Sequence, residues 1–217
     1  GELLRDYFSS KPVLIVRNYH LPSYVGQKSL VFIISYSGNT EETLGLYKEA
    51  LQRKCKIIIL TSGGFLGKQK GAVQLMQSLQ PRDAVPCMFL VLLRILGVKF
   101  DSKGIANLIE EIDTKIGNII VKELLKGKIP VVYGGNENYR GVVYTWKNLF
   151  NENSKLMCHG NVFSELNHNE IESKELEKFY FILLDDSEVQ GQLRKQLIFS
   201  DTIFHFQKIP LFGKNQL

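Results

Sequence analysis

Short apolar runs alternate with amphipathic helical patterns along most of this 217-residue chain. The runs at Leu30–Ile34, Lys56–Leu60 and Ile129–Val132 are rich in β-branched residues, and a turn sequence follows each of them. Continuous apolar strands between helices are typical of a parallel sheet that is buried on both faces. The alternation therefore predicts an α/β fold with mainly parallel sheets flanked by helices.

The same pattern sets the expected elements and their division into two parts. We expect strands at 12–16, 30–34, 56–60, 129–135, 180–184 and 203–206, and helices at 40–53, 83–96, 105–125, 139–150 and 189–199. A further helix is expected at the start of the chain, because apolar residues at positions 3, 4, 7 and 8 share one face. The segment Lys126-Gly127-Lys128 predicts a boundary between two tightly joined subdomains, 1–126 and 127–217.

Composition limits the classes of protein to consider. With 44% hydrophobic and 23% charged residues, the chain is long enough to bury a sizeable core. Its longest apolar run, Val85–Val98, contains Pro86 and Arg94 and is too short to span a membrane, so it predicts a buried helix. The net charge of +5 is spread along the chain. This suits a small anionic ligand and does not indicate nucleic acid.

The cysteines indicate neither disulfides nor a metal site. Cys55, Cys87 and Cys158 lie far apart and lack metal-ligand spacing, and no signal peptide is visible. We therefore expect free thiols, a reducing cytoplasmic location, and neither a metal nor a cofactor.

One strand-to-helix junction has the composition of a phosphate site. The strand at 30–34 runs into SYSGNTEET, residues 35–43, where the next helix begins. Free N–H groups of a first helical turn, the helix dipole and nearby hydroxyl groups all favour an anion. Thr40 is also a natural helix cap, so the pattern alone fits a phosphate site or an ordinary capped helix. A second turn, Thr61–Gly64, is expected at the same edge of the sheet.

The exact amino-acid sequence of this junction is more specific than its composition. SYSGNTEET resembles the signature of the sugar isomerase (SIS) fold, in which the two serines and the threonine of the loop bind phosphosugars. The resemblance implies that Ser35, Ser37 and Thr40 hold a sugar phosphate. It does not choose between an enzyme and a sugar-phosphate sensor.

Two polar groups interrupt the helical and strand patterns further along. Glu152 follows a helix in a largely apolar stretch, and His168 is the one histidine of four that lies in a cluster of amides and acids. A glutamate at a helix end is usually solvated, and a histidine in a loop is usually structural or solvated. Spacing alone therefore assigns neither residue a role.

Several motifs, in order, give a closer resemblance. They are SYSGNTEET at 35–43, TSGG at 61–64, PRDAVP at 81–86, WKNLFNEN at 146–153 and ELNHNE at 165–170. Together they look like the bifunctional phosphoglucose/phosphomannose isomerase family, over most of the chain. That family interconverts an aldose 6-phosphate, of glucose or mannose, with fructose 6-phosphate through a cis-enediol.

The resemblance implies roles for three side chains. Glu152 would be the base that moves a proton between C2 and C1, and His168 the acid/base that opens the sugar ring. Arg82 would stabilise the enediolate, because a guanidinium stays charged beside a developing oxyanion. An apolar setting would raise the pKa of a carboxylate such as Glu152 toward working pH.

Alternatives to these roles remain open. Glu165 and Glu170 compete with Glu152 as the base, and Arg82 could instead cap a helix or pair with Asp83 or another neighbour. Lys147 and Asn148 are candidates for orienting the substrate.

The resemblance also bears on partners and completeness. Family members place the active site at a dimer interface, which implies a homodimer with His168 contributed by the neighbouring subunit. They carry a glycine-rich turn before the GELLRDYF-like helix and a helical region after the last residues of this chain. We therefore expect an internal fragment that lacks its first strand and its C-terminal helices. The resemblance does not decide whether such a fragment is active.

Two further hypotheses come from other functional classes. One is a non-catalytic phosphosugar-binding SIS module, which would bind fructose 6-phosphate without turnover. The other is a structural remnant that binds no ligand.

Overall fold

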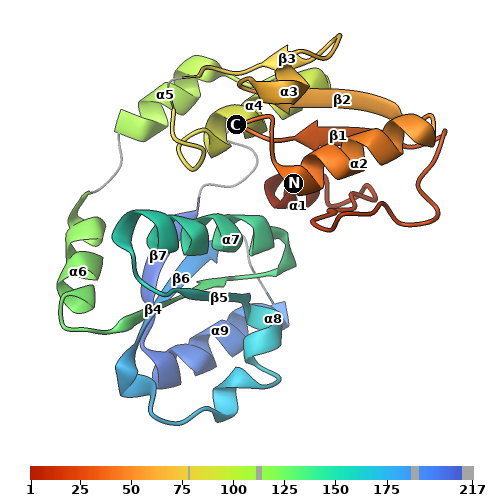
Figure 1. Cartoon of the computed structure of the whole chain (residues 1–217). Coiled ribbons are helices and arrows are strands. Elements are labelled where there is room, and N and C mark those ends of the chain that lie inside the picture. Colours follow the sequence, from red (N-terminus) through yellow and green to blue (C-terminus); the bar gives the residue numbers. More distant parts are fainter. Residues whose placement is uncertain (78, 111–113, 187–190, 212–217) are drawn as a thin grey trace. The chain divides into compact units, whose positions relative to one another are not determined.

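The computed structural model describes residues 1–77, 79–110, 114–186 and 191–211, and Figure 1 traces the chain. The elements form two compact units. The smaller unit is Leu14–Leu96, and the larger unit combines Gly1–Val13 with Gly97–Leu217. The first helix belongs to the larger unit because α1 (Glu2–Tyr7) packs against α7 (Arg140–Leu149). This grouping differs from the expected boundary at 126/127, which stays a prediction.

The smaller unit is a three-stranded parallel sheet with helices. Its strands are β1 (Leu30–Ile34), β2 (Lys56–Thr61) and β3 (Val73–Gln74), in the order β1-β2-β3. Its helices are α2 (Glu41–Gln52), α3 (Gly64–Gly67) and α4 (Val85–Ile95). The register pairs Ile34 with Leu60 at the carboxyl ends of β1 and β2. The turns that follow these two strands therefore begin side by side.

The core of the smaller unit follows from the helical period of α2. Leu46, Tyr47 and Ala50 are buried against Ile33 of β1 and Ile59 of β2. Residues one turn apart on a helix share a face, so these three form its inward stripe.

Arg53, just after α2, holds the irregular segment that leads to β1. Its guanidinium donates to the carbonyl oxygens of Leu21, Pro22 and Val25 at 3.2, 2.6 and 3.0 Å. It also donates to Glu49 at 2.6 Å, and Glu49 accepts from the Leu21 N–H at 2.7 Å. The hydrogen bond from Leu21 is the main cause that lowers the pKa of Glu49.

The larger unit has a four-stranded parallel sheet in the order β5-β4-β6-β7 (Figure 1). The strands are β4 (Ile129–Gly134), β5 (His159–Val162), β6 (Phe179–Asp186) and β7 (Gln207–Leu211). Besides α1 and α7, the helices are α5 (Ser102–Glu110), α6 (Thr114–Leu124), α8 (Phe163–Leu166) and α9 (Gly191–Phe204). Short turns of helix are η1 (Glu137–Tyr139), η2 (Phe150–Ser154), η3 (Glu170–Glu172) and η4 (Leu176–Lys178).

Both faces of this sheet are buried, as is typical of parallel sheets. Successive side chains of each strand point to opposite faces and enter two different cores. Val131 and Tyr133 of β4 pack in a core with residues of α8 and α9. Val132 of β4 and Ile182 of β6 pack in a second core with residues of α6 and α7. The expectation of parallel sheets flanked by helices is confirmed.

Most expected elements are present, and two expected strands are wrong. Residues 12–16 form no strand; Leu14 is 53% exposed, and the chain passes from one compact unit to the other there. Residues 203 and 204 belong to α9, and the strand expected at 203–206 begins instead at Gln207. Two strands were not expected: β3, which has only two residues, and β5.

Some expectations touch residues outside the described ranges. The helix expected at 105–125 corresponds to α5 and α6, with residues 111–113 between them undescribed. The helix expected at 189–199 corresponds to α9, and positions 189 and 190 lie outside the described residues. In the described ranges, no helix combines the length and the apolar character needed to cross a membrane. The three cysteines are free thiols, and burial raises the pKa of Cys158 to about 12.

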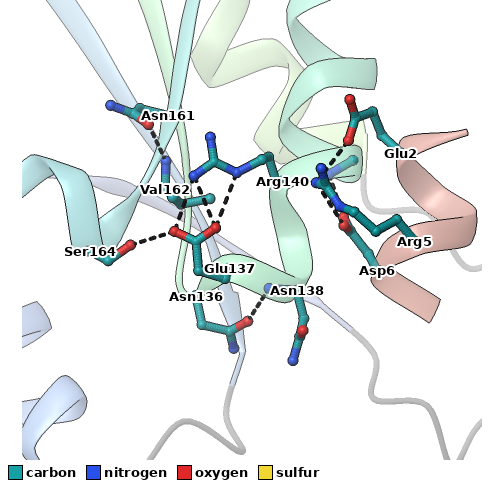
Figure 2. A network of polar contacts seen from close by, with 11 residues as sticks. Glu2, Arg5, Asp6, Asn136, Glu137, Asn138, Arg140, Asn161, Val162 and Ser164 are labelled. Atoms are coloured by element: carbon teal, nitrogen blue, oxygen red, sulfur yellow. Dashed lines mark hydrogen bonds and ion pairs between the residues drawn. The ribbon is translucent and has the colours of Figure 1, made fainter. Parts of the chain in front are cut away.

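A close approach joins α1 to α7 (Figure 2). The Gly141 N–H donates to the Asp6 carboxylate, which is 6% exposed. A Cβ at Gly141 would lie 2.6 Å from the Glu2 carbonyl carbon and from the Leu3 nitrogen. Because both neighbours are backbone atoms, only glycine lets the two helices meet at this distance. Burial is the main cause that raises the pKa of Asp6.

We predict that Gly141→Ala destabilises the protein by about 1–3 kcal/mol, the usual cost of overpacking. The matched control is Gly117→Ala in α6, where nothing lies within 4 Å of an added Cβ. Alanine favours a helix interior over glycine, so this control should gain about 0.5–1 kcal/mol. Urea unfolding of both variants measures the difference. Equal effects of the two substitutions would contradict the close approach.

Candidate functional site

The hydroxyl groups of the loop after β1 gather at the start of α2. Ser35 Oγ lies 2.8 Å from Thr40 Oγ1, and it accepts a hydrogen bond from the Gly38 N–H at 3.2 Å. Ser35 is buried, whereas Ser37 and Thr40 are exposed. Thr40 occupies the N-cap position of α2, yet its side chain makes no capping hydrogen bond. Thr40 is therefore the N-cap residue by position, as expected, but its hydroxyl pairs with Ser35 instead of making a capping hydrogen bond.

Gly38 makes this loop possible. Its φ of +70° lies in the left-handed region, and a Cβ there would stand 1.9 Å from the Gly63 carbonyl oxygen. No side chain fits between the two backbones, so the loop after β1 lies directly against the loop after β2.

Hydrogen bonds join the same two loops at further points. The Tyr36 carbonyl accepts from the Ser62 N–H at 2.9 Å and from the Ser62 hydroxyl at 2.6 Å. Asn39 Oδ1 accepts from the Phe65 N–H at 2.8 Å. Adjacent carboxyl ends of parallel strands are where α/β proteins bind ligands. The expectation that the turns at Ser35 and Thr61–Gly64 share one edge is confirmed.

Arg82 belongs to the same compact unit and lies just before α4. Its Nε atom is buried and has no hydrogen-bond partner among the described residues. No ion pair joins Arg82 to Asp83 in the part of the chain that the structure describes, so the pairing alternative has no support. A buried guanidinium N–H without a partner is costly, and an anion would satisfy it.

Glu152 lies in η2, a π-helical turn that continues α7. Such turns are rare and occur frequently at functional sites. The Glu152 side chain is exposed, so the apolar surround expected from its sequence neighbours is wrong for this chain by itself. Its apolar neighbour Phe150 packs instead with Trp146, at a ring-centroid distance of 6.2 Å, in the core formed with α6 and α7. The apolar residues near Glu152 in sequence therefore do not surround its side chain.

His168 lies in the turn after α8 and is exposed. Its backbone N–H donates to the Glu165 backbone carbonyl at 3.1 Å. The neighbouring side chains are held more firmly than His168 itself. Asn167 accepts from the Ser200 hydroxyl at 3.2 Å, and Glu170 accepts from Asn161 Nδ2 at 2.6 Å.

The second oxygen of Glu170 accepts from the Tyr133 hydroxyl, which belongs to a ring that is 2% exposed. Burial, with Glu170 as a second cause, raises the pKa of Tyr133, so its hydroxyl stays a proton donor. Glu170 thus uses both oxygens within the unit. This geometry disfavours Glu170 as the base, while Glu165 is exposed.

Figure 2 shows how α8 is tied to the start of α7. Glu137 accepts from the Arg140 guanidinium at 2.9–3.1 Å and from the Ser164 hydroxyl at 2.7 Å. Burial by itself raises the pKa of Glu137. The hydrogen bonds from Ser164 and Arg140 together lower it by more, so the net shift is downward. The carboxylate stays charged and fixes the helix that precedes His168.

The structure thus brings some predicted residues together. Ser35 and Thr40 are in contact, and Arg82 lies in the same compact unit. Glu152 and His168 both lie in the larger unit, on separate elements. Among the described residues no group of three or more His, Cys, Asp or Glu side chains could hold a metal ion.

The fold and the hydroxyl-lined loop define a SIS-type α/β protein. A glucosamine-6-phosphate deaminase from Thermotoga maritima has a similar fold, with a TM-score of 0.63 at 16% identity over 98% of this chain and 66% of that one. At this identity the likeness shows the fold alone. Residues 120–212 match the family described as bacterial phospho-glucose isomerase C-terminal SIS domain.

Sequence relatives are more specific. The bifunctional phosphoglucose/phosphomannose isomerase of Thermoplasma acidophilum is 33% identical over 99% of this chain and 72% of its own length. That of Caldicellulosiruptor bescii is 37% identical over 87% of this chain and 64% of its own length. The chain therefore belongs to the bifunctional phosphoglucose/phosphomannose isomerase family, and it spans about two thirds of the lengths of these relatives.

We predict that Glu170→Ala destabilises the protein by about 1–3 kcal/mol for each partner it leaves unpaired, Tyr133 and Asn161. The matched control is Glu170→Gln, which keeps one acceptor oxygen and nearly the same shape. Urea unfolding should show a smaller loss for glutamine than for alanine. An alanine variant as stable as the glutamine variant would contradict the anchoring role.

Proposed function

We propose that this protein is an aldose-ketose isomerase that interconverts glucose 6-phosphate, and also mannose 6-phosphate, with fructose 6-phosphate. The observation that carries the proposal is the hydroxyl pair of Ser35 and Thr40, 2.8 Å apart at the start of α2, in a chain of this family. Hydroxyl groups and free N–H groups at a helix N-terminus suit a phosphate dianion. Ser37, exposed in the same loop, is the third proposed phosphate ligand.

The chemistry assigns one task to each remaining residue. His168 takes the proton from the O1 hydroxyl of the ring form and returns one to O5, so that the C1–O5 bond breaks and the aldehyde forms. Glu152 then removes the C2 proton, and the electron pair forms the C1–C2 double bond of the cis-enediolate. Arg82 stabilises the negative charge on oxygen. The protonated Glu152 returns its proton to C1 while the O2 proton moves to O1, so that C2 becomes the carbonyl carbon of the ketose.

A homodimer is part of the proposal, with His168 completing the site of the partner subunit. The exposure of both Glu152 and His168 supports it, because a second subunit could shield these groups from water. We also propose a cytoplasmic role in carbohydrate metabolism and glycolysis, in which the substrate is a sugar phosphate and no cofactor takes part.

We predict that Glu152→Gln lowers solvent-deuterium exchange into C1 of fructose 6-phosphate by about 10²–10⁴-fold, the usual contribution of a general base. Proton NMR measures this exchange. Glu165→Gln, the control at the exposed competing carboxylate, should stay near the wild-type rate. Exchange that survives Glu152→Gln would show that the base is wrongly assigned. A wild-type chain that binds fructose 6-phosphate without exchange would instead support the non-catalytic module.

Mixed dimers test the shared site. Glu152→Gln and His168→Ala chains are each expected to be inactive, but a mixed dimer has one site with both wild-type residues if His168 crosses the interface. Random mixing should therefore restore about a quarter of the wild-type rate, because about half of two-fold symmetric dimers are mixed. No recovery, with mixed dimers confirmed by native mass spectrometry, would place both residues in one subunit.

A further inference from the structure

Tyr36 stands between the two serines of the phosphate loop and has no role in the proposed chemistry. Its hydroxyl donates to the Met76 carbonyl at 2.7 Å and accepts from the Leu79 N–H at 3.0 Å. These contacts cross 40 and 43 residues of sequence. One hydroxyl group therefore holds Met76 and Leu79, which lie shortly before Pro81 and Arg82 in the chain.

The backbone of Tyr36 is equally fixed. Its carbonyl accepts from Ser62 through both the N–H and the hydroxyl, and from the Thr61 hydroxyl at 3.3 Å. Tyr36 directly follows Ser35, whose hydroxyl pairs with Thr40. The ring is therefore anchored to the loop that carries the proposed phosphate ligands.

Few free torsions separate Leu79 from Arg82. The Gln80 carbonyl accepts from the Asp83 and Ala84 N–H groups at 2.9 and 3.1 Å, which closes a turn. Pro81 fixes its own φ within that turn. A displacement of Leu79 is therefore transmitted to the Arg82 backbone.

Arg82 needs such support because its own buried Nε has no hydrogen-bond partner in the described part of the chain. Its position depends on the backbone that carries it. A group that stabilises a transition state must be held in place before the reaction, since small displacements cost rate.

We propose that Tyr36 is a positioning residue that sets Arg82 relative to the phosphate-binding hydroxyls of Ser35 and Thr40. The inference rests on the proposed function, because it assigns Arg82 to the enediolate. Its consequence is that phosphate binding and enediolate stabilisation can be separated. Removing the Tyr36 hydroxyl leaves Ser35 and Thr40 in place and releases the segment before Arg82.

The test compares Tyr36→Phe with Tyr47→Phe in the full chain. Tyr47 is a matched control, because its hydroxyl donates to Gln69 at 3.3 Å in the same unit without leading to Arg82. Calorimetry gives the affinity for inorganic phosphate and for a five-carbon aldonate 5-phosphate, whose carboxylate imitates the enediolate. Steady-state kinetics give kcat and KM.

Tyr36→Phe should lower kcat by about 10–100-fold and weaken aldonate binding in parallel, with phosphate affinity and KM nearly unchanged. Tyr47→Phe should change none of these ratios. In an Arg82→Lys background, Tyr36→Phe should have little further effect on kcat, because the two residues act as one unit.

Three results would overturn the inference. The first is that Tyr36→Phe weakens the binding of phosphate and of the aldonate equally. The second is that it leaves both affinities unchanged, and the third is that it lowers kcat by its full factor in the Arg82→Lys background. If wild type binds both probes, any of these three results contradicts the inference about Tyr36 and leaves the proposed function standing. If wild type binds neither phosphate nor aldonate, the proposed function fails and the inference fails with it.

Discussion

The contact between Gly38 and Gly63 is the constraint on which the phosphate loop depends. A Cβ at Gly38 would meet the Gly63 carbonyl oxygen at 1.9 Å, so the two strand-to-helix loops touch through backbone alone. The left-handed turn at Gly38 brings its N–H to Ser35 and lets the chain reach Thr40 at the start of α2. The hydroxyl pair, the second loop and the segment held by Tyr36 all follow from that one approach.

Local patterns predicted the parts of the fold that depend on local physics. The apolar runs became β1, β2, β4 and β6, because their burial on both faces is visible in the sequence. Strand β5, with the sequence HGNV, lacks an apolar run and is an edge strand that forms only through pairing with β4. Ile203, Phe204 and Phe206 are apolar, yet α9 ends at Phe204, where His205 adopts a φ of +50° in a turn that apolar periodicity does not reveal.

The same distinction holds for the candidate site. Ser35 and Thr40 are five residues apart, so their contact could be predicted from a motif. The bonds of Glu170 to Tyr133 and of Tyr36 to Leu79 join residues 37 and 43 positions apart, and only the folded chain brings them together. The exposure of Glu152 was also hidden, because apolar neighbours in sequence point to another face of the helix.

The central claim is that the Ser35 and Thr40 hydroxyls hold a sugar phosphate. Calorimetry with fructose 6-phosphate and with free fructose tests it most directly, on wild type and on a Ser35→Ala, Thr40→Ala double variant. Wild type should bind the phosphate ester at least about 100-fold more tightly, because each hydrogen bond to a charged group contributes about 1.5–3 kcal/mol. The double variant should lose most of that preference. Equal affinity of wild type for both sugars, or an unchanged preference in the variant, would contradict the account.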